Sequence, residues 1–464
     1  MSRAGAGWAS PSPGWAGRRC SALRTGRDWW RWTAPGRRDA GGGGRCPCPH
    51  ERDSGLVRLE ATNEATNNAY GKASMTLLTA STASFGLVIT GTLTRPASFG
   101  ANRAMDTWAS TITSTSLAKS STHTVNSLSC SSGFPADNAI DAVVFDDTQP
   151  EPGIEVVERV VERGRSGVID GIVGLGGGSS LDAAKMASIL LRFGGNLRDY
   201  LGENQVQGRG LPMVLIPTTA GTGSESTPNA LFVVDGEKQA VVSRHLLPEA
   251  AIIDPALTLS APPSITASAG VDALVHACET YTSLGSTPLS EMYSLRAVEL
   301  IASSIRTAVW HGSDLKARTD MALGSFLAGV AITNAGTGAV HALAYPLGGK
   351  YRVAHGVSNS LMFPYVAEYN VVSNLTKFAI LAKALGERVE GLSIRDAALS
   401  FVNGVKAIIR DVRLPETLAE VGIGPSDIPH LVEVASRQTR LLKNNPRLLT
   451  RDDIEAIYRR ALGL

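Results

Sequence analysis

The sequence predicts an α/β nucleotide-binding domain with a parallel sheet, followed by an all-α domain. From residue 138 onward, a strand pattern (AIDAVVFDD), an amphipathic helix pattern (IEVVERVVERGRS) and a buried strand pattern (VIDGIVGLGGG) follow one another. A strand, a helix and a second strand at this spacing are typical of a parallel sheet. From residue 262 to the C-terminus, nearly every patterned segment has helical spacing. We therefore expect a boundary near Leu259 that divides an α/β domain, residues 75–259, from a helical domain, residues 260–464.

Three further segments extend the α/β pattern. The helical run SSLDAAKMASILLRF follows the second strand, and the run LPMVLIP has the composition of a buried strand. The run ALFVVDGEKQAVVS places Asp235 and Gly236 between two β-rich halves, which predicts a hairpin. Because ligands of two-domain enzymes commonly bind between the domains, we expect the functional site at the boundary.

Composition limits the classes of function to consider. The chain has 464 residues, of which 43% are hydrophobic, and a net charge of +2. No uninterrupted apolar run reaches the roughly 18 residues of a membrane-spanning helix, and so small a net charge predicts no strong attraction to nucleic acid or anionic lipid. The five cysteines are scattered, so we expect no disulfide framework and a reducing, cytoplasmic location. The expected partner is a small molecule.

Two segments depart from the globular pattern. Residues 1–50 contain nine Arg, two Asp and five of the seven Trp without periodicity, so we expect residues 1–74 to be a disordered or misassigned tail. A mitochondrial transit peptide is the alternative, because the segment is rich in Arg and poor in acidic residues, and Met75 is a candidate start. Residues 109–138 hold fourteen Ser or Thr and no apolar run that predicts a buried strand.

Two glycine-bearing runs follow predicted strands. In GLGGGSSLDAAK, residues 174–185, the glycines allow the backbone to approach a diphosphate, and the amide groups of the following helix point toward it. Turns of this kind also occur for purely structural reasons. The second run, PTTAGTGSE at residues 217–225, adds three Thr hydroxyls and two glycines at the edge where a parallel sheet binds its ligand. Together the two runs favour a dinucleotide site.

Four residues have the types and spacing of a metal site. Asp272 and His276 are four residues apart in a helical segment, so they project from one face of the helix. His341 lies in another helical run, and His355 stands at the start of the next. Three neutral imidazoles and one carboxylate suit Fe(II) or Zn(II), whereas magnesium and calcium prefer oxygen ligands. Each histidine alone fits an ordinary core or surface position, and the combination favours a metal.

The combination of GGGSSLDAAK, PTTAGTGSE, DALVH, GAVHALAYPLGG and AHGVSNSLMFP resembles the iron-containing (group III) alcohol dehydrogenases, whose fold is shared with dehydroquinate synthase. The resemblance covers about residues 138–464 and the short patch RPASFGANRAMDTW. It implies that a divalent metal is bound by Asp272, His276, His341 and His355. It also implies contacts with NAD or NADP from Gly176, Gly177, Gly178, Ser179, Asp182, Thr218, Thr219, Thr222 and Lys238. We expect a homo-oligomer, as a dimer.

Two residues near the histidines are candidates for supporting roles. Many family members carry a histidine four residues after the third ligand as part of a proposed proton relay, and this chain has Tyr345 there. A tyrosine hydroxyl with an ordinary pKa near 10 donates a hydrogen bond but is a poor base, so Tyr345 is a candidate catalytic residue whose alternative is packing beside Pro346. Glu279, three residues after His276, is expected to be an exposed helix carboxylate, and orienting that imidazole is the alternative.

The resemblance implies hydride transfer between an alcohol, or its aldehyde or ketone, and NAD(P), with the metal acting as a Lewis acid on the substrate oxygen. Hydroxyacid-oxoacid transhydrogenase and maleylacetate reductase activities are alternatives, and a dehydroquinate synthase-like lyase is disfavoured because the motifs follow the dehydrogenases. A metal-binding relic without turnover is a third class. It is suggested by residues 109–138, where the family has a strand that this chain lacks. A local reading-frame error or a looped-out insertion explains such a segment.

Overall fold

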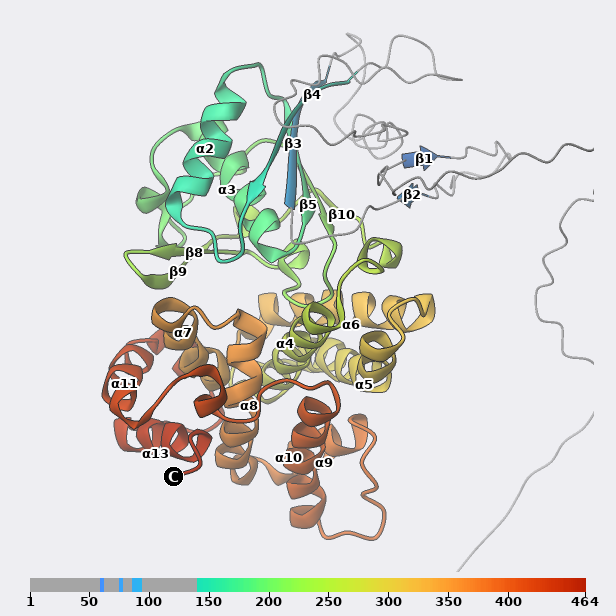
Figure 1. Ribbon diagram of the computed structural model, residues 1–464, viewed down its shortest axis with the longest axis vertical. Coiled ribbons are helices and arrows are strands. Elements are labelled where there is room, and N and C mark those ends of the chain that lie inside the picture. The colour runs from blue at the N-terminus through green and yellow to red at the C-terminus, as the bar shows by residue number, and fades with distance from the viewer. Residues whose placement is uncertain (1–58, 62–74, 78–85, 94–139) are drawn as a thin grey trace, which may run out of the picture. The chain divides into compact units, whose positions relative to one another are not determined.

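The computed structural model describes residues 59–61, 75–77, 86–93 and 140–464 (Figure 1). Strand β1 (Leu59–Ala61) pairs antiparallel with β2 (Met75–Leu77), so three residues of the expected N-terminal tail form a ladder. The rest of that tail and the whole of the atypical segment 109–138 lie outside the described residues.

A five-stranded sheet forms the centre of the α/β region. Its strands lie in the order β10-β7-β5-β3-β4. They comprise β3 (Gly86–Leu93), β4 (Ile140–Thr148), β5 (Gly171–Gly176), β7 (Met213–Pro217) and β10 (Ala250–Ala251). β5, β7 and β10 are parallel, which confirms the predicted fold class. β3 is antiparallel to both of its neighbours, β4 and β5, so these two run in the same direction, as the strand–helix–strand pattern predicted.

Two helices cover the sheet because each buries apolar side chains against it. α2 (Ile154–Arg165) buries Val157, Val160 and Val161, which recur at helical spacing. α3 (Gly178–Phe193) is almost entirely buried and packs against β5, β7 and β8. Figure 1 shows the two helices side by side next to the sheet, and they also contact each other. Their apolar side chains meet those of the strands in a core made by Val160, Ile172, Leu181, Ala184, Met213 and Leu215.

A smaller sheet forms beside the main one. It contains β6 (Gly202–Glu203), β8 (Asn229–Val234) and β9 (Glu237–Val242). β8 and β9 are antiparallel and are joined by Asp235 and Gly236, both with positive φ (54° and 79°). A two-residue turn with positive φ at both positions matches the twist of a hairpin, so the predicted hairpin is confirmed.

The remainder of the chain is helical, as predicted. The α-helices are α4 (Pro263–Thr282), α5 (Pro288–Trp310), α6 (Leu315–Ala335), α7 (Ala339–Tyr351), α8 (His355–Asn370), α9 (Leu375–Ala384), α10 (Ile394–Asp411), α11 (Ile428–Ser436), α12 (Thr439–Leu442) and α13 (Arg451–Ala461). α4 is the central helix, because it contacts α5, α6, α8 and α9. No single helix in the described part of the chain is long and apolar enough to cross a membrane, and α6 and α7 pass that test only as a pair bent by 107°.

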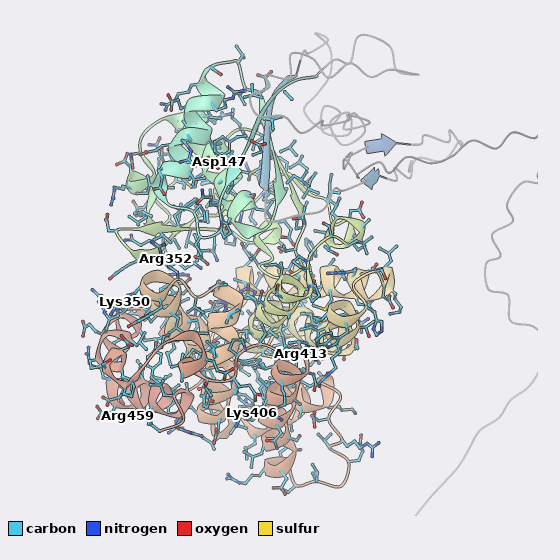
Figure 2. The ribbon with its side chains drawn as sticks, viewed as in Figure 1. Asp147, Lys350, Arg352, Lys406, Arg413 and Arg459 are labelled. Atoms are coloured by element: carbon cyan, nitrogen blue, oxygen red, sulfur yellow. The ribbon has the colours of Figure 1, made fainter. Side chains whose placement is uncertain are left out.

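Direct contacts join the helical and α/β regions. The short 3₁₀ helix η3 (Ser224–Ser226) packs against α6, where the Ser226 hydroxyl donates to the Phe326 carbonyl at 3.1 Å and the Thr333 hydroxyl donates to the Ser226 carbonyl at 2.8 Å. The C-terminal part of α7 packs against β9, and Figure 2 shows Lys350 and Arg352 at this end of the helix, next to the β8–β9 hairpin.

A buried polar cluster holds α3 against η3 and β8. The ammonium of Lys185, which is fully buried, donates to the Ser224 hydroxyl at 2.9 Å and to the Asn229 carbonyl at 2.6 Å. The two carboxylate oxygens of Asp182 accept hydrogen bonds from the Ser224 hydroxyl at 2.6 Å and from the Leu231 amide at 2.9 Å. The cluster therefore fixes the helix that begins with the glycine-rich turn.

Glu225 joins this cluster as a second buried acid. Burial raises the pKa of its carboxyl to about 7, against the opposing effects of a backbone hydrogen bond and of Lys185. Burial likewise lowers the pKa of Lys185 to about 8, although Asp182 and Glu225 oppose the shift. Near neutral pH, the charge of the cluster therefore depends on both Glu225 and Lys185.

Replacing Glu225 with Gln should change how stability depends on pH. The folded-state pKa of Glu225 lies above its ordinary value of 4.5, so its contribution to stability is complete below pH 4.5 and is lost as the pH rises through about 7. The free energy of unfolding of the natural protein, relative to Glu225→Gln, should fall by on the order of 3 kcal/mol across this window. Urea denaturation at a series of pH values measures it. Glu299→Gln, at an exposed helix position, should show no such trend, and a constant difference for Glu225→Gln would contradict the assignment.

Candidate active site

Three helices bring the four predicted metal ligands together. Asp272 and His276 lie one turn apart on α4, His341 lies in the first turn of α7, and His355 is the first residue of α8. One possible ligand atom from each residue lies within 4.8 Å of all the others. The Asp272 Oδ1 atom is 3.8 Å from His276 Nε2 and 3.7 Å from His355 Nε2. The sequence spacing therefore identified a single site.

The protonation states of this cluster suit a divalent cation. Burial alone would raise the pKa of Asp272, but the three imidazoles and a hydrogen bond from Asn359 outweigh it and hold the pKa at about 2. Burial lowers the pKa of His276 and lowers that of His355 well below its usual range. An ionised carboxylate and imidazoles without protons on the converging nitrogens are the forms that bind a metal. The donor set, three nitrogens and one oxygen, fits Fe(II) or Zn(II).

Glu279 orients one of the imidazoles, but not the one that its sequence position suggested. Its carboxylate is buried and accepts a hydrogen bond from Nδ1 of His341 at 2.6 Å, not from His276. It also accepts hydrogen bonds from the backbone amides of Gly338 at 3.1 Å and Val340 at 2.6 Å. Glu279 therefore caps the start of α7 and fixes the tautomer of His341, whose Nε2 keeps its lone pair toward the other ligands.

His276 is oriented by the second glycine-bearing run. Its Nδ1 atom lies 3.3 Å from the carbonyl oxygen of Gly221, which belongs to PTTAGTGSE. A carbonyl oxygen only accepts, so Nδ1 carries the proton and Nε2 keeps its lone pair. Nε2 is the nitrogen that lies 3.8 Å from Oδ1 of Asp272. The loop predicted to bind cofactor and the metal ligands are thus parts of one site.

The residues predicted to contact the cofactor fall into two groups. Gly176 ends β5, Gly177 precedes α3, and Gly178 and Ser179 begin that helix. The loop after β7, with Thr218, Thr219 and Thr222, lies against this turn: the Thr218 amide donates to the Gly176 carbonyl at 2.9 Å. A Cβ atom at Gly178 would approach Thr222 Cγ2 to 2.6 Å, so only glycine permits this contact. Amide groups at the start of α3 are available to an anionic group here.

Asp182 and Lys238 are engaged inside the protein. Both carboxylate oxygens of Asp182 are bound by Ser224 and Leu231, so its visible role is to hold the helix. The ammonium of Lys238, on β9, forms an ion pair with Glu151, with nitrogen–oxygen distances of 2.7 and 2.9 Å. Lys238 also contributes, after burial, to the lowered pKa of His355, which indicates that its charge lies on the metal side of the site.

Tyr345 lies beside the metal ligands. The centre of its ring is 6.3 Å from that of His355, and the side chain is buried. Burial raises the pKa of its hydroxyl, although the cationic groups of Arg440 and Lys238 oppose the shift. The hydroxyl is therefore protonated at neutral pH and is a hydrogen-bond donor, not a base.

Asn359 is a site residue that the sequence reasoning missed. It lies on α8, and its side-chain nitrogen is 2.6 Å from Oδ1 of Asp272. The available signal was its position four residues after His355, which places both side chains on one face of a helix.

The sequence matches two family descriptions. Residues 266–462 match "Fe-containing alcohol dehydrogenase family, C-terminal", and residues 114–255 match "Iron-containing alcohol dehydrogenase". The chain belongs to the iron-containing alcohol dehydrogenase family. This confirms the resemblance drawn from the motifs, and within this family the four converging residues form the metal site.

Individual members of the family align with this chain over most of their own length. Long-chain-alcohol dehydrogenase 1 of Geobacillus thermodenitrificans is 44% identical over 69% of this chain and 82% of that protein. The NAD-dependent methanol dehydrogenase of Bacillus methanolicus is 36% identical over 70% of this chain and 85% of that protein. The crystal structure of a 1,3-propanediol oxidoreductase has a TM-score of 0.67 and 38% identity, covering 68% of this chain and 84% of that chain.

Glu279→Gln should weaken metal binding by about 10- to 100-fold, the usual effect of removing a carboxylate that orients a metal-binding imidazole. Glutamine retains only one acceptor oxygen for three donors, so His341 loses its fixed orientation. Chelator competition measures the affinity. Glu291→Gln is the matched control, because Glu291 also makes side-chain hydrogen bonds, to Ser286 and Lys377, but touches no ligand. Equal affinities of natural protein and Glu279→Gln would refute the orienting role.

Proposed function

We propose that this family member transfers a hydride between an alcohol and NAD, and in the reverse direction reduces the corresponding aldehyde or ketone, with Fe(II) or Zn(II) bound by Asp272, His276, His341 and His355. The observation that carries the proposal is the convergence of these four ligand atoms within 4.8 Å. The contact of His276 with Gly221 supports it, because it joins the metal ligands to the loop that lies against the glycine-rich turn.

The names of the relatives support the substrate class and the cofactor. They include proteins named for long-chain alcohols, methanol and 1,3-propanediol, and the methanol dehydrogenase is named as NAD-dependent. We therefore propose an alcohol or aldehyde as substrate and NAD in preference to NADP. Iron in preference to zinc follows the family description.

The chain's own groups bind and orient the reactants. When bound, the metal supplies Lewis-acid polarisation of the substrate oxygen, and the nicotinamide accepts or donates the hydride. The amides that begin α3 are placed for the cofactor diphosphate. The glycines of the turn have no side chain that would stand between these amides and the diphosphate. Glu279 and Gly221 hold two imidazoles with their Nε2 atoms toward the ligand set. Tyr345, whose ring lies beside His355, is the candidate hydrogen-bond donor to the substrate oxygen.

Oxidation of primary alcohols should produce NADH, measured as absorbance at 340 nm with iron-loaded protein. His355→Ala leaves a site of three ligands, so it should lose both most of its metal and its turnover. His430→Ala, at an exposed position on α11, should change neither. Full metal occupancy in His355→Ala would exclude that ligand, and metal-loaded natural protein without turnover on any alcohol would favour a metal-binding relic.

Tyr345→Phe should keep its metal and lose roughly fivefold to tenfold in kcat/KM, the effect of about one hydrogen bond. Because the raised pKa keeps the hydroxyl protonated through neutral pH, the shape of the pH profile between about pH 6 and 9 should not change. Steady-state kinetics across this range provides the measurement. Loss of a titration limb in the variant would show that Tyr345 exchanges a proton in the reaction.

A further inference from the structure

The side chain of Asn359 touches three of the four metal ligands. It is completely buried on α8, one turn after His355. Its amide nitrogen lies 2.6 Å from Oδ1 of Asp272, 3.2 Å from Nε2 of His341 and 3.3 Å from Nε2 of His355. These three atoms belong to three of the four residues whose ligand atoms converge within 4.8 Å. Asn359 is therefore in contact with the ligand set itself and not only with the helices that carry it.

The chemistry of the contact fixes the orientation of the amide. An ionised carboxylate accepts hydrogen bonds only, so the NH₂ group must face Asp272, since the carbonyl oxygen would repel it at 2.6 Å. Nε2 of His341 is also an acceptor, because its Nδ1 donates to Glu279. The single lone pair of that Nε2 atom is the one that a metal would take, so the contact that can remain beside a bound metal is the one to Asp272, whose Oδ1 has a further lone pair.

This orientation leaves the other end of the amide without a partner. The Oδ1 atom of Asn359 is buried and accepts no hydrogen bond within the described residues. An unsatisfied buried acceptor destabilises a fold by about 1–3 kcal/mol. A leucine side chain has the same branched shape and no polar atom, so for packing alone leucine would serve better at this position. The fold by itself therefore does not explain the amide.

We propose that Asn359 is a positioning residue of the metal centre, which holds the Asp272 carboxylate toward the three imidazoles and so determines how tightly the metal is retained. The inference rests on the proposed function in requiring metal at these ligands. The hydrogen bond to Oδ1 fixes the rotation of the carboxylate, which is otherwise free to turn about its terminal bond. Without that bond, binding must also order Asp272, and the affinity falls accordingly.

Asn359→Leu separates this role from a structural one. We expect metal affinity, measured by competition with a chelator, to fall by about 10- to 100-fold. The melting temperature of the metal-free protein should change little, because removal of the unsatisfied oxygen offsets the hydrogen bond that Asp272 loses. The visible spectrum of the Co(II)-loaded variant should also change, since it reports the geometry of the ligands.

Ser358→Ala is the matched control on the same helix. Ser358 is equally buried, and its hydroxyl donates to the Val353 carbonyl at 3.2 Å, away from the four ligands. Its replacement should lower the melting temperature and leave metal affinity unchanged. Should Asn359→Leu fold poorly, Asn359→Ala tests the same loss of the donor with a smaller side chain.

The outcomes distinguish this inference from the proposed function. If natural protein binds metal and both Asn359 variants bind it equally well, the inference is wrong and the proposed function stands. A natural protein that binds no metal at these residues would overturn both. Weaker affinity that is matched in Ser358→Ala would show general damage to α8 and would also overturn the inference.

Discussion

The site depends first on the buried carboxylate of Glu279. It projects from α4 and receives three donors from the beginning of α7: the amides of Gly338 and Val340 and Nδ1 of His341. A negative charge at the start of a helix satisfies amides that have no partner within the helix and is favoured by the helix dipole. One side chain thus joins the helix that carries Asp272 and His276 to the helix that carries His341. Metal geometry and helix packing are consequences of the same contact.

The same region is held from its outer side by the C-terminal part of the chain. The side-chain amide of Asn444 donates to the Thr337 carbonyl at 3.0 Å, just before α7 begins. The amides of Asn445 and Asn370 bond each other reciprocally at 2.8 Å, which links this segment to the end of α8. α7 and α8, which carry His341 and His355, are therefore fixed at their ends by polar contacts from distant sequence. Rigid placement of the ligands allows a metal to bind without reordering the protein.

Local spacing revealed the ligands, and long-range packing decided their partners. Asp272 and His276 could be paired from sequence because a helix places residues four apart on one face. The same reasoning linked Glu279 to His276 as an alternative to an exposed position, but the buried carboxylate faces α7, where it accepts a hydrogen bond from an imidazole 62 residues away. The resemblance implied a cofactor contact for Asp182, whose partners, Ser224 and Leu231, come from segments 42 and 49 residues distant. Helical periodicity contains no information about contacts between distant segments. For the same reason, the sequence pattern could not predict that β3 runs antiparallel to its neighbours.

β3 provides the interior strand that the main sheet needs, although that strand was expected in residues 109–138. A sheet that lacked an interior strand would leave backbone groups unpaired, so a strand was required between β4 and β5. The strand that fills this position is Gly86–Leu93, which precedes the Ser- and Thr-rich segment 109–138. Its last residue, Leu93, pairs with Ile140, the first residue of β4. The end of β3 and the start of β4 therefore lie at the same end of the sheet's strands. Antiparallel neighbours need no crossover, whereas parallel ones need a connection of a dozen or more residues. The position between β4 and β5 is therefore filled by β3.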